Sequence, residues 1–257
     1  MNEVRHTNQP ASGATLYKSE RTRVTVDQGP FVIHINFPGR LVPRSNDHGH
    51  GPLAAIAESL LDPGAWIRLH EHSNDEIISW VPEGVMRHND RTVGELIADP
   101  DHLMIMNAGR SFWHEERTEH HDPHLRMLQI FVRPHTLDLE PEIQHGPIDP
   151  LVPNEWRHLF GPVSSDAPFT VRNDVHLHDI RLDRDTSVEL PAIAGWDTYF
   201  YVFTGVVEVD GTPFGEAESG LIVGDGGLTV TAQAPTLLVS FLINPNATTT
   251  RMGTVGR

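Results

Sequence analysis

Residues 69–84 read LHEHSNDEIISWVPEG, and this stretch indicates both a fold and a chemical site. Side chains two residues apart along a β-strand point to the same face, so His70 and His72 would present their imidazoles together. The stretch at 76–81 reads EIISWV, mostly apolar and of the length of a buried strand, and Pro-Glu-Gly at 82–84 signals a turn. We therefore expect two short strands here, with both histidines on one face of the first.

The same pattern of short apolar or alternating runs, separated by turn residues, continues in both directions along the chain. In the first half we expect strands at 22–25, 31–37, 54–60, 67–72, 76–81, 84–89, 102–106, 112–116 and 125–131. In the second half we expect strands at 175–182, 186–190, 199–204, 206–209, 220–223, 228–231 and 236–241. No stretch has a sustained helical period. An all-β chain of two successive barrels or sandwiches is predicted.

The segment at 133–163 differs from its surroundings because it is rich in proline and poor in periodic apolar residues. It is typical of a linker, with one helical turn expected around 154–159. The predicted division is therefore an N-terminal domain at 17–135, a linker at 136–163 and a C-terminal domain at 164–257.

The charge and the cysteine content of the chain exclude several kinds of binding partner and site. Lys and Arg number 19 against 35 Asp and Glu, a formal charge of −16 over 257 residues. Such a surface repels phosphate backbones and anionic membranes, so neither nucleic acid nor membrane is expected as a partner. The chain has no cysteine, which excludes disulfides and thiolate ligands. It also has no apolar leader or run of about 18 apolar residues, so we expect a cytoplasmic protein.

A second stretch completes the candidate site. Residues 106–116 read MNAGRSFWHEE, which places His114 and Glu116 on one face of a strand. If this strand lies opposite the one with His70 and His72, three imidazoles and one carboxylate converge. That donor set suits Fe(II), and also Ni, Cu, Mn or Zn.

A His-x-His pair by itself carries little weight in a chain with 17 histidines. Two other such pairs occur. His48 and His50 are expected in a solvated loop, and His176 and His178 on a strand face with ordinary polar contacts. The histidines at 120, 121 and 124 follow Glu116 in a polar stretch and are expected to be solvated. The case for a metal site therefore rests on the two stretches taken together.

The spacing G-x5-H-x-H-x3-E-x7-G at 64–84 resembles the first cupin motif, and N-A-G-x4-H at 107–114 resembles a second motif of the pirin type. Together with MLQIFVRP at 127–134 and later segments at 167–182 and 219–243, they make the chain resemble the pirin family, close to the bacterial pirin-like quercetin dioxygenases. The resemblance extends from about residue 17 over nearly the whole chain.

The resemblance implies two tandem cupin barrels, also described as double-stranded β-helix or jelly-roll barrels, of which only the N-terminal one binds metal. The family's ligand positions fall on His70, His72, His114 and Glu116. The resemblance then implies one divalent transition metal, with Fe(II) as the first choice. It implies a small flavonol-like aromatic and O2 as the substrates. The resemblance leaves open a non-enzymatic metal-binding regulator that acts through a protein partner, and a cupin used for isomerisation or hydrolysis.

Several neighbouring residues bear on the site. Glu71 and Glu115 stand where the family usually has other residues; these two and Asp75 are expected to point to the opposite strand face. Glu76 is a ligand in many cupins, but the pirin pattern takes its carboxylate from the second motif, so Glu76 is expected to orient a ligand imidazole. An apolar wall is expected from six residues: Trp66, Trp80, Met104, Met106, Phe112 and Trp113.

Overall fold

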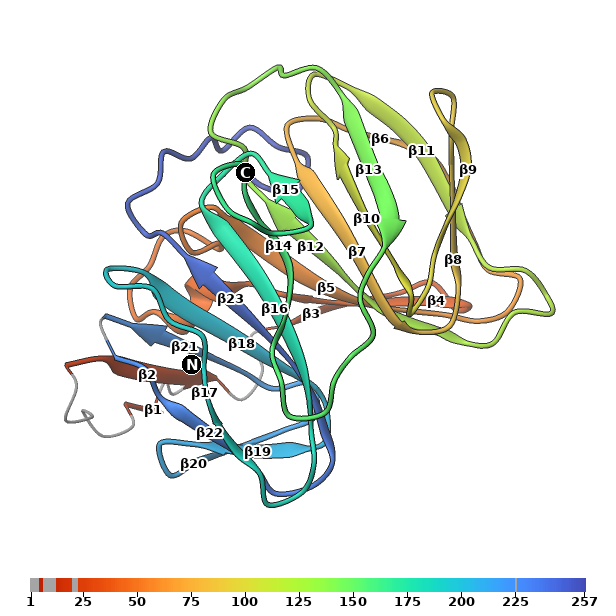
Figure 1. Cartoon of the computed structure of the whole chain (residues 1–257). Helices are drawn as coiled ribbons and strands as arrows, with labels where there is room; N and C mark the ends of the chain where they lie inside the picture. Colours follow the sequence, from red (N-terminus) through yellow and green to blue (C-terminus); the bar gives the residue numbers. More distant parts are fainter. Residues whose placement is uncertain (1–4, 7–12, 20–22, 225) are drawn as a thin grey trace.

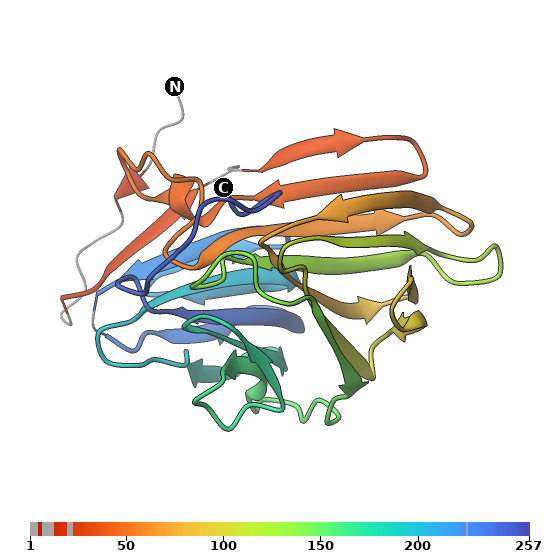
Figure 2. The same cartoon turned by 90° about the horizontal axis from the view of Figure 1, so that it is seen from above.

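The computed structural model describes residues 5–6, 13–19, 23–224 and 226–257. Strands form nearly all of its regular structure (Figures 1 and 2), and the described part holds a single short 3-10 helix, η1, at Pro38–Leu41. No helix in these residues is long and apolar enough to cross a membrane. The all-β prediction is confirmed.

The N-terminal barrel is built from a seven-stranded and a four-stranded antiparallel sheet (orange to green in Figure 1). The larger sheet has the order β13-β10-β7-β12-β5-β4-β3 and the smaller one β6-β11-β8-β9. In chain order the strands are β3 (Val24–Asp27), β4 (Phe31–Asn36), β5 (Leu53–Leu61), β6 (Trp66–His72), β7 (Glu76–Glu83), β8 (Met86–Asp90), β9 (Gly94–Ala98), β10 (His102–Asn107), β11 (Phe112–Arg117), β12 (Leu125–Val132) and β13 (Glu142–Pro147).

The C-terminal barrel repeats this plan, with an eight-stranded sheet of order β1-β2-β21-β18-β23-β16-β14-β15 and a four-stranded sheet of order β17-β22-β19-β20. Its strands are β1 (Arg5–His6), β2 (Thr15–Ser19), β14 (Arg157–Pro162), β15 (Phe169–Val171), β16 (Val175–Leu182), β17 (Ser187–Glu189), β18 (Asp197–Thr204), β19 (Val206–Val209), β20 (Thr212–Gly215), β21 (Ser219–Val223), β22 (Thr229–Ala232) and β23 (Thr236–Ile243).

The proline-rich segment contributes to both barrels. Its strand β13 pairs with β10 of the N-terminal barrel, and β14 pairs with β16 of the C-terminal barrel. The helical turn expected around 154–159 is wrong, because Arg157 already opens β14. The domain boundaries stay a prediction. The expected strand at 22–25 begins outside the described residues, and β3 starts at Val24.

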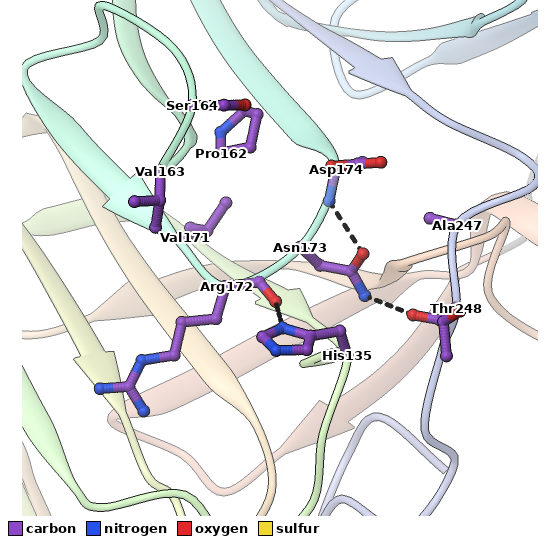
Figure 3. A pocket seen from close by; sticks show the side chains of 10 residues that line it. All are labelled: His135, Pro162, Val163, Ser164, Val171, Arg172, Asn173, Asp174, Ala247 and Thr248. Atoms are coloured by element: carbon purple, nitrogen blue, oxygen red, sulfur yellow. Dashed lines mark hydrogen bonds between the residues drawn. The ribbon is translucent and has the colours of Figure 1, made fainter.

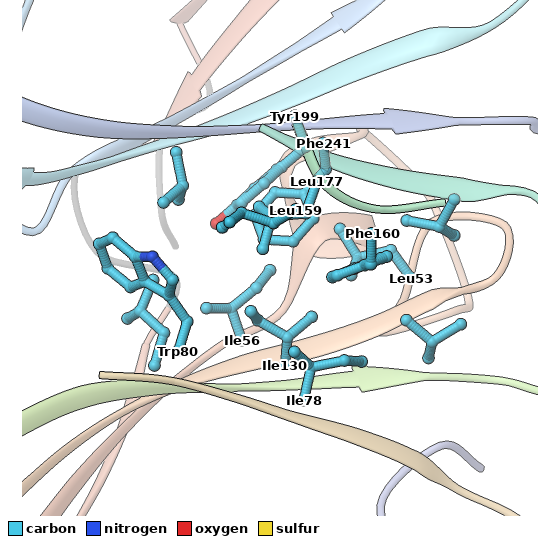
Figure 4. Close-up of a cluster of buried hydrophobic side chains, with 14 of the residues drawn as sticks. Leu53, Ile56, Ile78, Trp80, Ile130, Leu159, Phe160, Leu177, Tyr199 and Phe241 are labelled. Carbon is cyan, nitrogen blue, oxygen red and sulfur yellow. The ribbon is translucent and has the colours of Figure 1, made fainter. Parts of the chain in front are cut away.

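The two large sheets pack face to face through a shared apolar core (Figure 4). Ile56, Ile78 and Ile130 come from the N-terminal barrel, and Leu177 and Phe241 from the C-terminal one. All five are fully buried. Because each face is apolar, separating the barrels would expose both to water at roughly 25 cal/mol per Å². The interface therefore has the character of a domain core.

Polar groups inside this interface are paired across it. Trp80 Nε1 donates to Asp179 Oδ2 at 3.0 Å, and Arg157 also binds this carboxylate. The hydroxyl of Tyr201 donates to Glu58 Oε2 at 2.7 Å, and Arg126 donates to the other oxygen of Glu58 at 2.7 Å. Buried polar groups are costly when unpaired, so these bonds fix the relative placement of the sheets.

The end of the chain returns to the N-terminal barrel, and we call residues 253–256 the C-terminal strap. Thr254 N donates to Ser73 O at 3.0 Å. The backbone N–H groups of Val255 and Gly256 donate to the two oxygens of Asp75 at 2.9 and 2.8 Å. The strap is thereby held against the turn between β6 and β7.

Arg133, which is fully buried, ties the strap to a loop of the N-terminal half. Its guanidinium donates to both oxygens of Asp47 at 2.8 and 2.6 Å and to Gly51 O at 3.0 Å. Its Nε donates to Gly256 O at 3.0 Å. Removal of the side chain would leave the carbonyls of Gly51 and Gly256 without this donor, and Asp47 would keep only Gly49 N and Arg251.

The substitution Arg133→Met should lower the free energy of unfolding by about 1–3 kcal/mol, because it removes the bidentate partner of Asp47 and leaves the carbonyls of Gly51 and Gly256 without this donor. Urea unfolding followed by fluorescence measures this. Arg110→Met is the control: the exposed Arg110 pairs with the exposed Glu140 and should leave the urea midpoint unchanged. Equal midpoints for Arg133→Met and wild type would contradict the role of Arg133.

Candidate metal centre

Three of the four predicted ligands meet inside the N-terminal barrel. Strands β6 and β11 are antiparallel neighbours, and their register places His70 directly opposite His114. The ring centroids of His70 and His114 lie 4.4 Å apart, those of His70 and His72 5.0 Å, and those of His72 and His114 5.3 Å. One ring nitrogen from each lies within 4.8 Å of the others. We call these three residues the histidine cluster.

The free nitrogens of the cluster fit a metal ion. His70 Nδ1 lies 2.9 Å from Arg68 O, so Nδ1 carries the proton and Nε2 keeps its lone pair. His114 Nε2 and His72 Nδ1 are buried and have no hydrogen-bond partner among the described residues. Converging imidazole nitrogens that the protein does not itself satisfy are what a transition-metal site requires.

The barrel interior keeps the rings of His70 and His114 neutral. Burial first, and then the neighbouring imidazoles of His70, His88 and His72, lower the pKa of His114 to about 2. Burial is also the largest cause of the lowered pKa of His70. A neutral imidazole is the form that binds a metal, so burial favours the metal-binding form of His70 and His114.

Glu116, the fourth predicted ligand, is buried beside the cluster but not within it. A register shift in the β6–β11 pairing falls between His114 and Glu116. The carboxylate groups instead with His88 and His114, within 4.8 Å of a nitrogen of each. It accepts a hydrogen bond from Gln129 Nε2 at 2.6 Å. Burial raises its pKa to about 7, opposed by the imidazole of His72 and by the bond from Gln129.

His88 was not singled out from the sequence, yet it touches the cluster. It lies on β8, fully buried, with its Nδ1 3.1 Å from His114 Nδ1. Its Nε2 lies 2.8 Å from Asp90 Oδ2. Burial lowers the pKa of His88. The alternation of Met86, His88 and Asp90 along one strand is the signal that could have identified it, since all three then share the inner face.

Glu76 does not orient a ligand imidazole, so that expectation is wrong. It lies at the start of β7 and accepts hydrogen bonds from Asn107 Nδ2 at 3.0 Å and from Arg172 N at 2.7 Å. It therefore joins the N-terminal barrel to the segment before β16. Burial raises its pKa to about 7, opposed by these hydrogen bonds and by the charge of Arg172.

The other acidic neighbours divide into two kinds. Glu71 and Glu115 point to the outer face as predicted, where Glu71 accepts from Ser111 Oγ and Glu115 from Trp66 Nε1. Asp75 is different, because it is fully buried and turned inward. Its Oδ2 lies 3.6 Å from Nδ1 of His72. The expectation of an outward Asp75 is wrong because the C-terminal strap supplies its hydrogen-bond donors.

The apolar wall is smaller than expected. Phe112 and Met106 pack in the apolar cluster that also contains Phe131, whose ring centroid lies 6.2 Å from that of His72.

The other four expected residues lie elsewhere. Trp66 and Trp113 are 58% and 48% exposed on the outer face of β6 and β11, so they do not line the interior. Met104 packs in a separate cluster of the barrel, and Trp80 belongs to the core between the barrels.

The remaining histidines take two forms. Those at 120, 121 and 124 are exposed, as predicted. His50 is not simply solvated, since its Nε2 lies 2.7 Å from Asp197 of the C-terminal barrel. His176 lies 3.0 Å from His158, and the His158 and His178 rings stack at 4.3 Å. Among the described residues, His158, His176 and His178 do not form a group whose donor atoms all lie within 4.8 Å of one another.

A hollow of about 430 Å³ lies at the junction of the barrels, away from the histidine cluster (Figure 3). Its polar groups mostly bind one another: Asn173 Nδ2 donates to Thr248 O, and His135 Nδ1 donates to Arg172 O. Asn173 Oδ1 accepts from Asp174 N. These bonds leave few polar atoms to recognise a ligand, so the metal chemistry is assigned to the barrel.

The raised pKa of Glu76 predicts a pH dependence of stability. The folded protein keeps a proton that the unfolded chain releases above pH 4.5, so the free energy of unfolding should fall by about 3 kcal/mol between pH 4.5 and about 7. Glu76→Gln removes this contribution. Urea unfolding at several pH values should show a smaller loss over that window in Glu76→Gln than in wild type. The exposed-site variant Glu208→Gln should follow wild type; parallel curves for all three would exclude the effect.

Known proteins share the architecture of this chain. The quercetin 2,3-dioxygenase of Escherichia coli (strain K12) is 21% identical over 200 residues, which are 78% of this chain and 86% of the relative. The crystal structure of YhhW from Escherichia coli has a TM-score of 0.77 at 20% identity, covering 89% of this chain and 97% of that one.

Two further structures extend the comparison. The bacterial pirin YhhW of Escherichia coli in complex with nickel(II) has a TM-score of 0.75 at 20% identity and covers 89% of this chain and 98% of that one. An oxalate decarboxylase from Bacillus subtilis has a TM-score of 0.61 at 12% identity, over 89% of this chain and 78% of that one. At these identities the likeness establishes the fold, two tandem cupin barrels.

The family model named Pirin matches residues 28–132, the range that contains β4 to β12 and the histidine cluster. This range of the chain is therefore a pirin domain.

Proposed function

We propose that the N-terminal barrel binds one divalent transition metal through His70, His72, His114 and Glu116. The observation that carries the proposal is the convergence of three imidazoles inside the barrel, of which His72 and His114 each have a buried nitrogen without a partner among the described residues. A shift of the Glu116 carboxylate toward the cluster would complete the set. The donor set favours Fe(II), and admits Ni, Cu, Mn or Zn. The C-terminal barrel is proposed to be metal-free.

We further propose that the protein is a dioxygenase for small flavonol-like aromatics, with O2 as second substrate. A metal bound here would polarise a chelating enol or phenol oxygen and prepare the ring for oxygen attack. The carboxylate of Glu116, buried beside the histidine cluster, would accept the phenolic proton. Phe112 and Phe131 shield the site from water. Support comes from the related protein named quercetin 2,3-dioxygenase.

A second candidate is a metal-binding regulator that acts through a protein partner. The observation in its favour is the outer face of the ligand strands, where Trp66, Leu69 and Trp113 are 58%, 43% and 48% exposed. Exposed apolar side chains that gather on one face are typical of interaction surfaces. For either candidate, the charge of −16 disfavours nucleic acid, and a chain without cysteine suits the cytoplasm.

Metal analysis tests the site directly. The purified protein should hold one metal ion per chain after loading with Fe(II) without oxygen, and His70→Ala should hold much less because it removes one of three converging nitrogens. Glu116→Ala should weaken binding by 10-fold or more. The control His176→Ala, in the C-terminal barrel, should keep full occupancy. Stoichiometric metal in both His70→Ala and Glu116→Ala would overturn the ligand assignment.

Flavonol turnover tests the reaction. The iron-loaded protein in air should bleach the long-wavelength absorbance of quercetin, and the same protein without O2 should not. Glu116→Gln should lower kcat by about 10²–10⁴-fold if the carboxylate accepts the phenolic proton. Metal-loaded protein that leaves a range of flavonols unchanged in air would exclude this reaction. Partner capture that depends on the iron oxidation state, without turnover, would instead favour the regulator.

A further inference from the structure

We propose that His88 and Asp90 form a hydrogen-bonded relay that positions His114 and fixes which of its nitrogens faces the metal. The inference rests on the proposed metal site and adds two positioning residues to it. The relay is the chain of contacts from Asp90 Oδ2 to His88 Nε2 at 2.8 Å, and from His88 Nδ1 to His114 Nδ1 at 3.1 Å.

Asp90 anchors the relay because its other oxygen is already occupied. Oδ1 accepts hydrogen bonds from Thr92 N at 2.5 Å and from Val93 N at 2.9 Å, in the turn after β8. Backbone N–H groups can only donate, so they orient the carboxylate as an acceptor. Oδ2 is left to face His88. The carboxylate is therefore held by the backbone, independently of the metal.

The direction of each hydrogen bond follows from this anchor. Oδ2 accepts, so His88 Nε2 carries a proton and donates it. In a neutral ring the other nitrogen, Nδ1, then has a lone pair and must accept. The donor across the 3.1 Å contact is accordingly Nδ1 of His114. His114 Nε2 is left with its lone pair, and that is the buried nitrogen with no partner in the described part of the protein.

Burial makes the relay effective. His88 is fully buried, Asp90 is 7% exposed and His114 is 1% exposed, so water does not compete for the same bonds. Outer hydrogen-bond partners of this kind commonly set ring orientation and strengthen a ligand imidazole, and losing one costs about 10–100-fold in metal affinity. His88 and Asp90 thus act on the metal through His114.

Asp90→Asn is the decisive variant, because it reverses the relay without removing any atom of the ring. The amide oxygen must remain toward Thr92 N and Val93 N, which turns the NH2 group toward His88 Nε2. His88 then carries its proton on Nδ1 and donates to His114, whose own proton is driven to Nε2, the metal-facing nitrogen. We expect Co(II) affinity, measured by competition with a chromophoric chelator, to fall 10–100-fold.

A pair of substitutions at position 88 separates the relay from simple packing. A glutamine side chain can donate to Asp90 through its NH2 group and accept from His114 through its oxygen, so His88→Gln should keep Co(II) affinity within a few-fold. His88→Leu fills the space without either bond and should lose 10–100-fold. Equal affinities for His88→Gln and His88→Leu would overturn the relay.

The matched control is another His–Asp pair. Asp197 Oδ2 lies 2.7 Å from His50 Nε2, and Asp197 Oδ1 accepts from Gly224 N at 2.9 Å. Asp197→Asn makes the same chemical change away from the cluster and should leave Co(II) affinity unchanged. A loss equal to that of Asp90→Asn would mean that the effect is a general one of buried carboxylates.

Spectroscopy of the Co(II) protein gives a readout independent of affinity and of turnover. Proton NMR should show a strongly shifted, exchangeable N–H signal from Nδ1 of His114, and Asp90→Asn should abolish it. X-ray absorption should count three imidazoles; a count of four would make His88 a ligand and contradict the relay. A wild-type protein that binds no Co(II) would instead refute the metal site itself. Failure of the relay and failure of the proposed site are thus distinguishable.

Discussion

The pairing of β6 with β11 inside a closed barrel is the constraint on which the site depends. The antiparallel register sets His70 opposite His114, and the two-residue period of each strand then fixes which side chains face inward. A slip of one residue in either strand would turn its histidines of the cluster outward and bring residues such as Trp113 into the interior. The chemistry of the site is thus a consequence of sheet register, and the turns that fix the register belong to the site as much as the ligands do.

Desolvation is the second physical element, and it acts in opposite directions on the two kinds of donor. Burial lowers the pKa of His114 and raises the pKa of Glu116, because in each case water no longer stabilises the charged form. Both effects favour an electrically neutral interior in the metal-free protein. A divalent cation changes that balance, since it stabilises the carboxylate and binds imidazoles that already have free lone pairs.

Much of this arrangement could be predicted from residues 69–84 and 106–116, because strand periodicity is local and decides which side chains share a face. The three-histidine cluster and the all-β fold follow from that periodicity, together with the resemblance to cupin motifs. Strand periodicity could not predict three other features, because each depends on a partner distant in sequence. Asp75 turns inward to the C-terminal strap, and Glu76 binds Arg172. Trp66 points outward to Glu115 on the neighbouring strand. Glu116 lies beside the cluster rather than within it because the β6–β11 pairing shifts register between His114 and Glu116. No local sequence pattern predicts this shift.

The ends of the chain are exchanged between the barrels. Strand β2 (Thr15–Ser19) pairs with β21 of the C-terminal barrel, while the C-terminal strap binds Asp75 of the N-terminal barrel. The polypeptide therefore crosses between the two halves at both termini as well as through the proline-rich segment. A fragment made by cutting that segment would lack part of its own barrel and carry an unpaired piece of the other. For this reason the half that carries the histidine cluster is not a separable module, since residues outside its own sheets take part in closing it.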